Sequence, residues 1–223
     1  MSSSSAPSSP GETKGLRCTP VPSKRYHDVL EHLKYNFFAD EPLNRAIGLC
    51  RKGESHQELE RHCLFTLAQG ISCMIVDEGD KIVGTALNGI VKRGEREECE
   101  RRLAELQDDK FKSIFGLLYK INEKVDIFAK YDVDELFDCR ILSVDETFRG
   151  KGLADLLIKN SLKIAKDAGF KVFKADSTGL FSQKAFLKND FKIITEIRYS
   201  DVDERLRPGP PHEALKLLVK ILD

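Results

Sequence analysis

Residues 142–154 read LSVDETFRGKGLA, an apolar, β-prone run that passes through a basic turn with two glycines into an amphipathic stretch. A strand, such a turn and a helix are suited to binding phosphate, because backbone N–H groups and the positive end of the helix dipole point at one place. Gly150 and Gly152 would let a ligand approach the backbone without an intervening Cβ. Glycines are also common in turns that merely lead into a helix, so the turn alone is compatible with a phosphate site and with a purely structural role.

Comparison with known phosphate-binding sequence patterns argues against two kinds of phosphate site. A P-loop requires GxxxxGK followed by Ser or Thr, and the sequence contains no such run. A dinucleotide-binding fingerprint requires a third glycine where Asp155 stands, and it normally opens the first βαβ unit of a chain rather than a late one. The pattern that fits is Arg/Gln-x-x-Gly-x-Gly/Ala, which Arg149, Gly152 and Ala154 supply in order.

The elements that must position this turn are expected to form one α/β domain with a mixed sheet. Hydrophobic periodicity predicts a helix after an N-cap at Ser23 and another after Ser55, where SHQE has the capping-box form. The other predicted elements are a strand at 16–21, a hairpin at 71–91, one or two helices within 95–130, a strand at 135–144 and a helix at 151–169. The chain is then predicted to form a strand, a helix and two further strands, with a loop at 201–213 between the last two strands.

Composition excludes several classes of protein. Lysine plus arginine and aspartate plus glutamate number 36 each, so no overall charge favours nucleic acid or an anionic membrane. The cysteines lack metal-ligand spacing and indicate reduced thiols, and the histidines form no metal-ligand cluster, so we predict no metal. No run suggests a membrane span or signal peptide, and a cytoplasmic monomer is expected. Residues 1–15 are rich in Ser, Pro and Gly and are predicted to be a disordered tail before a domain at 16–223.

The run LSVDETFRGKGLADLL resembles the central motif of the GCN5-related N-acetyltransferase (GNAT) superfamily, with Glu146 where many relatives carry proline. FFADEPL at 37–43, ILSVD before the turn and a Ser-containing helix start about 30 residues after it are similar to the insect arylalkylamine N-acetyltransferases. The resemblance covers most of residues 16–222. It implies a single-domain GNAT fold with about seven strands flanked by helices, acetyl-CoA as co-substrate, and an acceptor such as dopamine, tyramine, octopamine or serotonin.

Acetyl transfer to an amine needs a base, because an alkylamine with a pKa near 10.4 is only about one part in a thousand unprotonated at neutral pH. Glu41 is the candidate, beside Pro42 and with Phe37 and Phe38 able to desolvate it and raise its pKa. The resembling family assigns its base to this glutamate. Without the resemblance, Asp40 and Glu41 are more simply read as acids at the start of a helix.

The resemblance also places the acetyl-CoA contacts. The backbone N–H of Val144 is expected to polarise the thioester carbonyl, with Leu142 aligning the pantetheine arm. The predicted cofactor-binding residues are Leu142, Ser143, Val144, Arg149, Gly150, Lys151, Gly152, Leu153 and Ala154.

Thr178 and Ser182 match positions where the insect enzymes carry two functional serines, and either could protonate the departing thiolate. The alternative is that both cap a helix. Because a thiol of pKa about 8.5 is a tolerable leaving group, losing this acid should cost less than losing Glu41.

The leading hypothesis is therefore an acetyl-CoA-dependent N-acetyltransferase that acts on a small, arylalkyl primary amine by direct attack in a ternary complex. A covalent acetyl-cysteine route is disfavoured, since no cysteine lies in the motif or beside the candidate base. Acetylation of a non-aromatic amine such as a polyamine, and a non-catalytic acyl-CoA-binding protein, are the alternatives.

Overall fold

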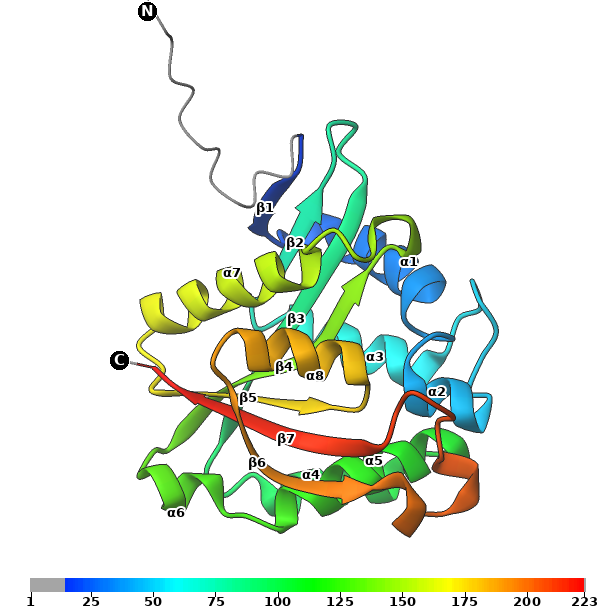
Figure 1. The fold of residues 1–223 in the computed structure, drawn as a ribbon, viewed down its shortest axis with the longest axis vertical. Coiled ribbons are helices and arrows are strands. Elements are labelled where there is room, and N and C mark those ends of the chain that lie inside the picture. Colours follow the sequence, from blue (N-terminus) through cyan, green and yellow to red (C-terminus); the bar gives the residue numbers. More distant parts are fainter. Residues whose placement is uncertain (1–14, 223) are drawn as a thin grey trace, which may run out of the picture.

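The computed structural model of the protein describes residues 15–222, apart from the side chains of residues 96, 97 and 99. Strands and α-helices follow one another in short runs along this part of the chain (Figure 1). The strands are β1 (Arg17–Pro20), β2 (Cys73–Val76), β3 (Ile82–Lys92), β4 (Glu135–Val144), β5 (Val172–Ser177), β6 (Lys192–Arg198) and β7 (Ala214–Ile221). The α-helices are α1 (Tyr26–Asn36), α2 (Pro42–Ile47), α3 (Gln57–Leu67), α4 (Arg96–Glu105), α5 (Asp109–Glu123), α6 (Ile127–Tyr131), α7 (Leu153–Asp167) and α8 (Leu180–Lys188).

The strands form one mixed, seven-stranded sheet in the order β1-β2-β3-β4-β5-β7-β6. Neighbouring strands are antiparallel except β4 and β5, which are parallel. β4 and β5 pair only where Phe137 and Asp138 meet Phe173 and Lys174, so beyond these residues the two strands separate. β3 follows β4 along its whole length, with Arg140 as an extra residue that bulges the ladder.

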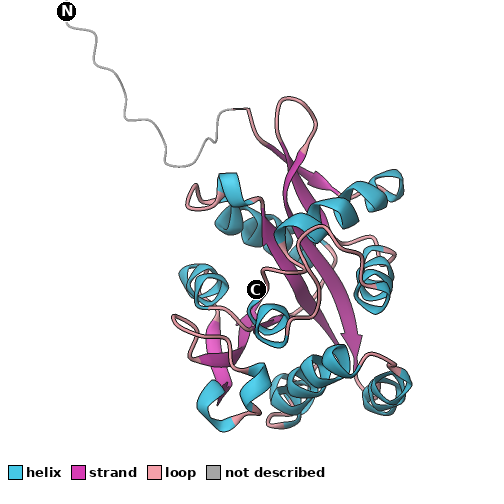
Figure 2. Ribbon diagram, turned by 90° about the vertical axis from the view of Figure 1, so that its right-hand side faces the viewer, coloured by secondary structure: helices cyan, strands magenta, loops and turns pink. Residues whose placement is uncertain are grey.

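Helices cover both faces of the sheet, as the side view in Figure 2 shows. One apolar cluster joins the sheet to α1, α3 and α5, and a second joins the opposite face to α7 and α8. The alternation of side chains along each strand supplies both clusters, because successive residues point to opposite faces. The predicted α/β fold with a mixed sheet of about seven strands is confirmed.

Several local expectations were wrong. Ser23 opens a 3-10 turn and caps no helix, since α1 begins after Arg25. The cap of α3 is His56, whose Nδ1 accepts the N–H of Leu59, in place of Ser55. Residues 95–130 form three helices rather than one or two, because the chain is restarted at each break by a capping aspartate.

The remaining expectations concern the ends and the last loop. The predicted tail, residues 1–15, lies outside the described residues except for Gly15. The loop before β7 contains two short 3-10 turns, Tyr199–Asp201 and Glu204–Leu206, and β6 stops at Arg198. Within residues 15–222, none of the helices has the length and apolar character needed to cross a membrane.

Candidate active site

The glycine turn has the backbone geometry that its residue types suggested. Gly150 and Gly152 both lie in the left-handed region, at φ +77° and +83°, where other residues are strained. A Cβ added at either position would meet no described atom within 4 Å, so the protein leaves open space beside the backbone. Gly152 is the N-cap of α7 and offers no side-chain acceptor, which leaves the first amides of the helix, including those of Leu153 and Ala154, without an intrahelical partner.

The end of β4 directs two further amides into open space. The N–H of Asp145 donates to the carbonyl of Val83 on β3 at 2.9 Å. Successive N–H groups of a strand point to opposite edges, so those of Val144 and Leu142 point away from β3, towards the edge from which β5 has separated. The backbone amide of Ser143 points towards β3, and the side-chain hydroxyl of Ser143 lies 3.0 Å from Nε2 of buried His32.

Glu41 lies between α1 and α2 and serves two purposes at once. It is the N-cap of α2, with Oε2 accepting the N–H of Asn44 at 2.7 Å, while Pro42 occupies the first helical position. Its other oxygen, Oε1, accepts a hydrogen bond from the hydroxyl of Thr178 at 2.6 Å. Burial raises the pKa of Glu41, and the hydrogen bonds from Thr178 and the start of α2 only partly offset this effect.

Thr178 and Ser182 flank the start of α8, but neither caps it. The N-cap is Gly179, and the N–H of Leu180 donates to Nδ1 of His212 at 3.1 Å, so the helix-cap interpretation is wrong. Ser182 Oγ lies 2.6 Å from the hydroxyl of Ser177 and donates to the carbonyl of Gly179 at 3.0 Å.

One cavity of about 1150 Å³ connects these groups. It lies between the sheet and helices α3 and α5, and Glu41, Leu142, Thr178 and Ser182 all line it. Aromatic side chains of Phe37, Phe111, Phe115 and others form much of the remaining wall. The cavity therefore brings an enclosed carboxylate, hydroxyl groups and the separated edge of β4 to one space, although they come from distant parts of the sequence.

Comparison with known proteins places this arrangement in a family. The sequence profile of the acetyltransferase (GNAT) family matches residues 35–191, which is most of the chain. This chain belongs to the GNAT acetyltransferase family. It is similar to the crystal structure of arylalkylamine N-acetyltransferase 2 from Aedes aegypti, with 44% identity and a TM-score of 0.91 over 94% of this chain and 100% of that one.

More distant solved structures share the acetyltransferase fold. The mosquito arylalkylamine N-acetyltransferase like 5b is 23% identical, with a TM-score of 0.84 over 93% of this chain and all of that one. The polyamine N-acetyltransferase of Drosophila melanogaster is 22% identical, with a TM-score of 0.82 over the same shares of the two chains. At these identities the likeness extends to the fold alone.

Acetyltransferases of this family take the acetyl group from acetyl-CoA, and the residues here fit that co-substrate. The open side of both glycines, the uncapped start of α7 and the outward amides of Leu142 and Val144 lie in succession along the chain. Amides at a helix start suit a diphosphate, and amides on a strand edge suit the amide-containing pantetheine arm.

The two basic residues predicted to meet phosphate are placed differently in this acetyltransferase. Arg149 turns back towards the end of α1, where it forms a 2.9 Å ion pair with Asp40 and donates to the carbonyl of Asn36. Burial alone would raise the pKa of Asp40, but the bonds from Arg149 and Arg45 lower it. Lys151 holds its ammonium 4.7 Å from the ring centre of Phe148. Arg149 thus fastens the turn to the segment that carries Glu41, and its contact with phosphate stays a prediction.

Three residues of the acetyltransferase site were missed from the sequence. Tyr199 donates through its hydroxyl to the carbonyl of Thr178 at 2.7 Å, and Ser177 and His212 make the contacts described above. All three depend on chain segments that meet only in the folded protein, and no local pattern marks them. Among the described residues, no group of three His, Cys, Asp or Glu side chains is arranged to hold a metal ion.

Proposed function

We propose that the protein is an acetyl-CoA-dependent arylalkylamine N-acetyltransferase that joins the acetyl group directly to a primary amine in a ternary complex. The observation that carries this proposal is the position of Glu41, a carboxylate with a raised pKa on the wall of the cavity that the separated edge of β4 also reaches. The similarity to the Aedes aegypti enzyme supports the choice of an arylalkylamine acceptor.

The proposed division of labour follows from the contacts. Glu41 removes the proton from the ammonium form of the acceptor, directly or through one water, and its raised pKa brings it closer to the amine in proton affinity. The N–H of Val144 polarises the thioester carbonyl, and acetyl-CoA supplies the acetyl group when bound. Thr178 donates to Glu41, so it positions the base, while the hydroxyl pair of Ser177 and Ser182 is the better candidate for protonating the thiolate.

A covalent route through cysteine is not supported. Cys139 lines the cavity, but burial raises its pKa well above the usual value for a thiol. A thiol that stays protonated is a poor nucleophile. Direct attack by the amine therefore needs fewer assumptions than an acetyl-cysteine intermediate.

A polyamine is the second candidate acceptor, because Glu58 and Asp126 line the cavity and could attract a second cation. Both carboxylates are already engaged with backbone amides, Glu58 with Gln107 and Asp108 and Asp126 with Ala129. The aromatic wall suits a ring better than a flexible chain of amines. We therefore place the arylalkylamines first, propose dopamine as one of them, and propose that the enzyme acts as a monomer in the cytoplasm.

Thiol release from acetyl-CoA tests the proposal. Purified protein is incubated with acetyl-CoA and, separately, dopamine, tyramine, phenethylamine, spermidine or agmatine, and free coenzyme A is followed with a thiol-reactive chromophore. We expect amine-dependent release with the arylalkylamines. Coenzyme A binding in calorimetry without turnover of any amine would instead identify an acyl-CoA-binding protein.

A further inference from the structure

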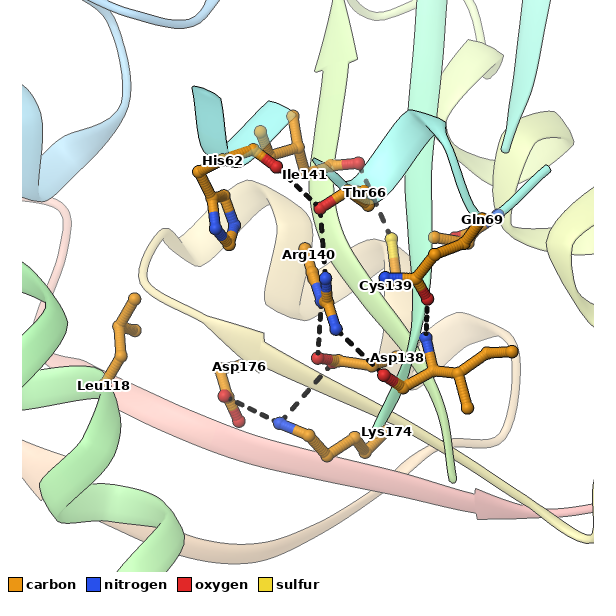
Figure 3. Close-up of polar contacts among 12 residues, drawn as sticks. His62, Thr66, Gln69, Leu118, Asp138, Cys139, Arg140, Ile141, Lys174 and Asp176 are labelled. Atoms are coloured by element: carbon orange, nitrogen blue, oxygen red, sulfur yellow. Dashed lines mark hydrogen bonds and ion pairs between the residues drawn. The ribbon is translucent and has the colours of Figure 1, made fainter. Parts of the chain in front are cut away.

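A cluster of buried polar side chains forms one wall of the cavity and takes no part in the chemistry described above. This polar wall consists of Asn122 on α5, Asp138 and Arg140 on β4, and Lys174 and Asp176 on β5 (Figure 3 shows the four charged residues). The charged side chains are between 5% and 17% exposed. Charged groups buried to this degree are costly unless each finds a partner.

The hydrogen bonds of the polar wall leave one atom without a partner. Lys174 Nζ donates to Asn122 Oδ1 at 3.1 Å and to Asp176 Oδ2 at 2.8 Å, and lies 3.5 Å from Asp138. Asn122 also donates to Asp176 Oδ2, at 2.7 Å. Asp176 Oδ1 is buried and accepts no hydrogen bond from any described residue. The donors around it are therefore used on its other oxygen.

Arg140 completes the wall, and the contacts of its guanidinium are with residues other than Asp176. Its guanidinium donates to the hydroxyl of Thr66 at 3.1 Å and to the carbonyl of Ile90 at 3.0 Å, and its Nε lies 3.5 Å from Asp138. Neither Lys174 nor Arg140 donates a hydrogen bond to Asp176 Oδ1. A hydrogen-bond donor from a ligand in the cavity would meet this need.

The charge of the wall indicates what kind of donor fits. Two cations and two carboxylates balance, so the wall carries no net formal charge to attract a second ammonium group. Burial would lower the pKa of Lys174, but Asp138 and Asp176 raise it, which keeps the ammonium charged. Burial raises the pKa of Asp176 despite this neighbour, a sign that its carboxylate is poorly solvated. A neutral donor such as a hydroxyl adds a hydrogen bond without adding charge.

The distance from the wall to the candidate base suits a ring with a short arm. Asp176 and Thr178 both line the cavity and are two residues apart, so their Cα atoms are separated by no more than about 7 Å. Thr178 contacts Glu41, which marks the position of the amine. A phenol ring with a two-carbon amine arm spans a similar length.

Resting on the proposed function, we infer that Asp176 Oδ1 accepts a hydrogen bond from a ring hydroxyl of the acceptor, so the polar wall selects hydroxylated phenylethylamines. Because Oδ1 is buried, the carboxylate must turn about its terminal torsion, which is broad for aspartate, to meet the ring hydroxyl. The new hydrogen bond has to offset any loosening of the bonds that Lys174 and Asn122 make to Oδ2. Amines without a ring hydroxyl leave Oδ1 unpaired. Polyamines bring a charge that the balanced wall does not need.

Wild-type enzyme and a matched substrate series test the inference first. Tyramine, 4-fluorophenethylamine and phenethylamine share the arm and ring, but only tyramine has a hydroxyl donor. We expect kcat/KM for tyramine to exceed that of the other two by about tenfold or more. Equal values for tyramine and the fluoro analogue, or a higher value for agmatine or spermidine, would overturn the inference.

The variant Asp176→Asn then assigns the preference to this residue. The single side-chain oxygen of the asparagine would accept the hydrogen bonds from Lys174 and Asn122. Its NH2 group would then stand where Asp176 has the unpaired oxygen Oδ1. The preference for tyramine should fall below about threefold, while kcat/KM for the fluoro analogue changes less than about threefold. Loss of activity towards both substrates in equal proportion would show a structural role and contradict the inference.

Two controls separate the possible failures. Glu105→Gln makes the same carboxylate-to-amide change at an exposed residue of the cavity and should keep the tyramine preference. Coenzyme A affinity and thermal stability check that Asp176→Asn is folded, and the wild-type series decides the matter if it is not. Turnover of arylalkylamines without regard to the hydroxyl removes this inference alone, whereas no turnover of any amine removes it together with the proposed function.

Discussion

The acetyl-CoA side and the acceptor side of the cavity are built in different ways. On the acetyl-CoA side, the groups offered to the ligand are backbone amides at the end of β4 and the start of α7. On the acceptor side, they are side chains that converge from α1–α2, α5, β4 and β5. A backbone site tolerates many side chains but requires particular dihedral angles, whereas a side-chain site depends on each residue. This contrast predicts opposite responses to substitution.

The largest effect is expected on the acceptor side, at Glu41. Glu41→Gln keeps an oxygen that can cap α2 but cannot take up a proton, so kcat/KM should fall by about 10²–10⁴-fold. In the wild type, kcat/KM should rise with pH as Glu41 ionises, and this ascending limb should be missing from the variant. Steady-state rates between pH 5 and pH 9 provide the measurement.

Glu41→Gln should lower the activity but should not lower the thermal stability of the protein. Because the folded pKa of Glu41 is raised, its contribution to stability is fully present below the unfolded pKa and is lost as pH rises through the folded value. At neutral pH the variant should therefore melt no earlier than the wild type. Asp40→Asn is the neighbouring control, because it removes the ion pair through which Arg149 fastens the glycine turn to the end of α1. It should weaken coenzyme A binding and leave the ascending limb of the pH profile in place. An unchanged pH profile in Glu41→Gln would rule out Glu41 as the base.

On the acetyl-CoA side, the next largest effect is expected at Gly152. Its φ of +83° makes Gly152→Ala strained by about 1–2 kcal/mol, and the new Cβ would project into space that no described atom fills. Coenzyme A affinity, measured by calorimetry, should weaken by about tenfold or more, and the melting temperature should fall by a few degrees.

Gly169→Ala separates strain from contact with the ligand. Gly169 lies just past the other end of α7 at φ +82°, also with no described atom within 4 Å of an added Cβ. It should lose similar stability and keep its affinity for coenzyme A. If both variants bound coenzyme A as the wild type does, the turn would be a helix start and nothing more.

The same contrast explains what the sequence could predict. The turn and α7 are local features, with glycines, a basic residue and helical periodicity within some 25 residues, and the structure reproduces them. The bond between Glu41 and Thr178 joins residues 137 positions apart, so the sequence identified both residues but not their contact. The caps supplied by His56 and His212 escaped notice because histidine is not among the usual capping residues.

The polar wall was overlooked although it leaves a trace in the sequence. Asp138 and Arg140 alternate with apolar residues in one strand, as do Lys174 and Asp176 in the next. Charges at every second position of a strand mark one polar face, and here that face lies inside the protein. What the sequence lacked was the tertiary arrangement that turns this face towards a cavity.

The smallest effect is expected at Thr178, where the side chain acts through another residue. Its hydroxyl donates to Glu41 and thereby lowers the pKa of that carboxylate, so Thr178→Val should raise this pKa further. The ascending limb of the pH profile should move to higher pH, with a loss in kcat/KM at neutral pH of no more than about tenfold. Thr178→Ser restores the donor and should restore the wild-type limb. If Thr178 instead protonated the thiolate, Thr178→Val would lower the rate at every pH and leave the ascending limb in place. Side chains on the acceptor side would then also act on the leaving group.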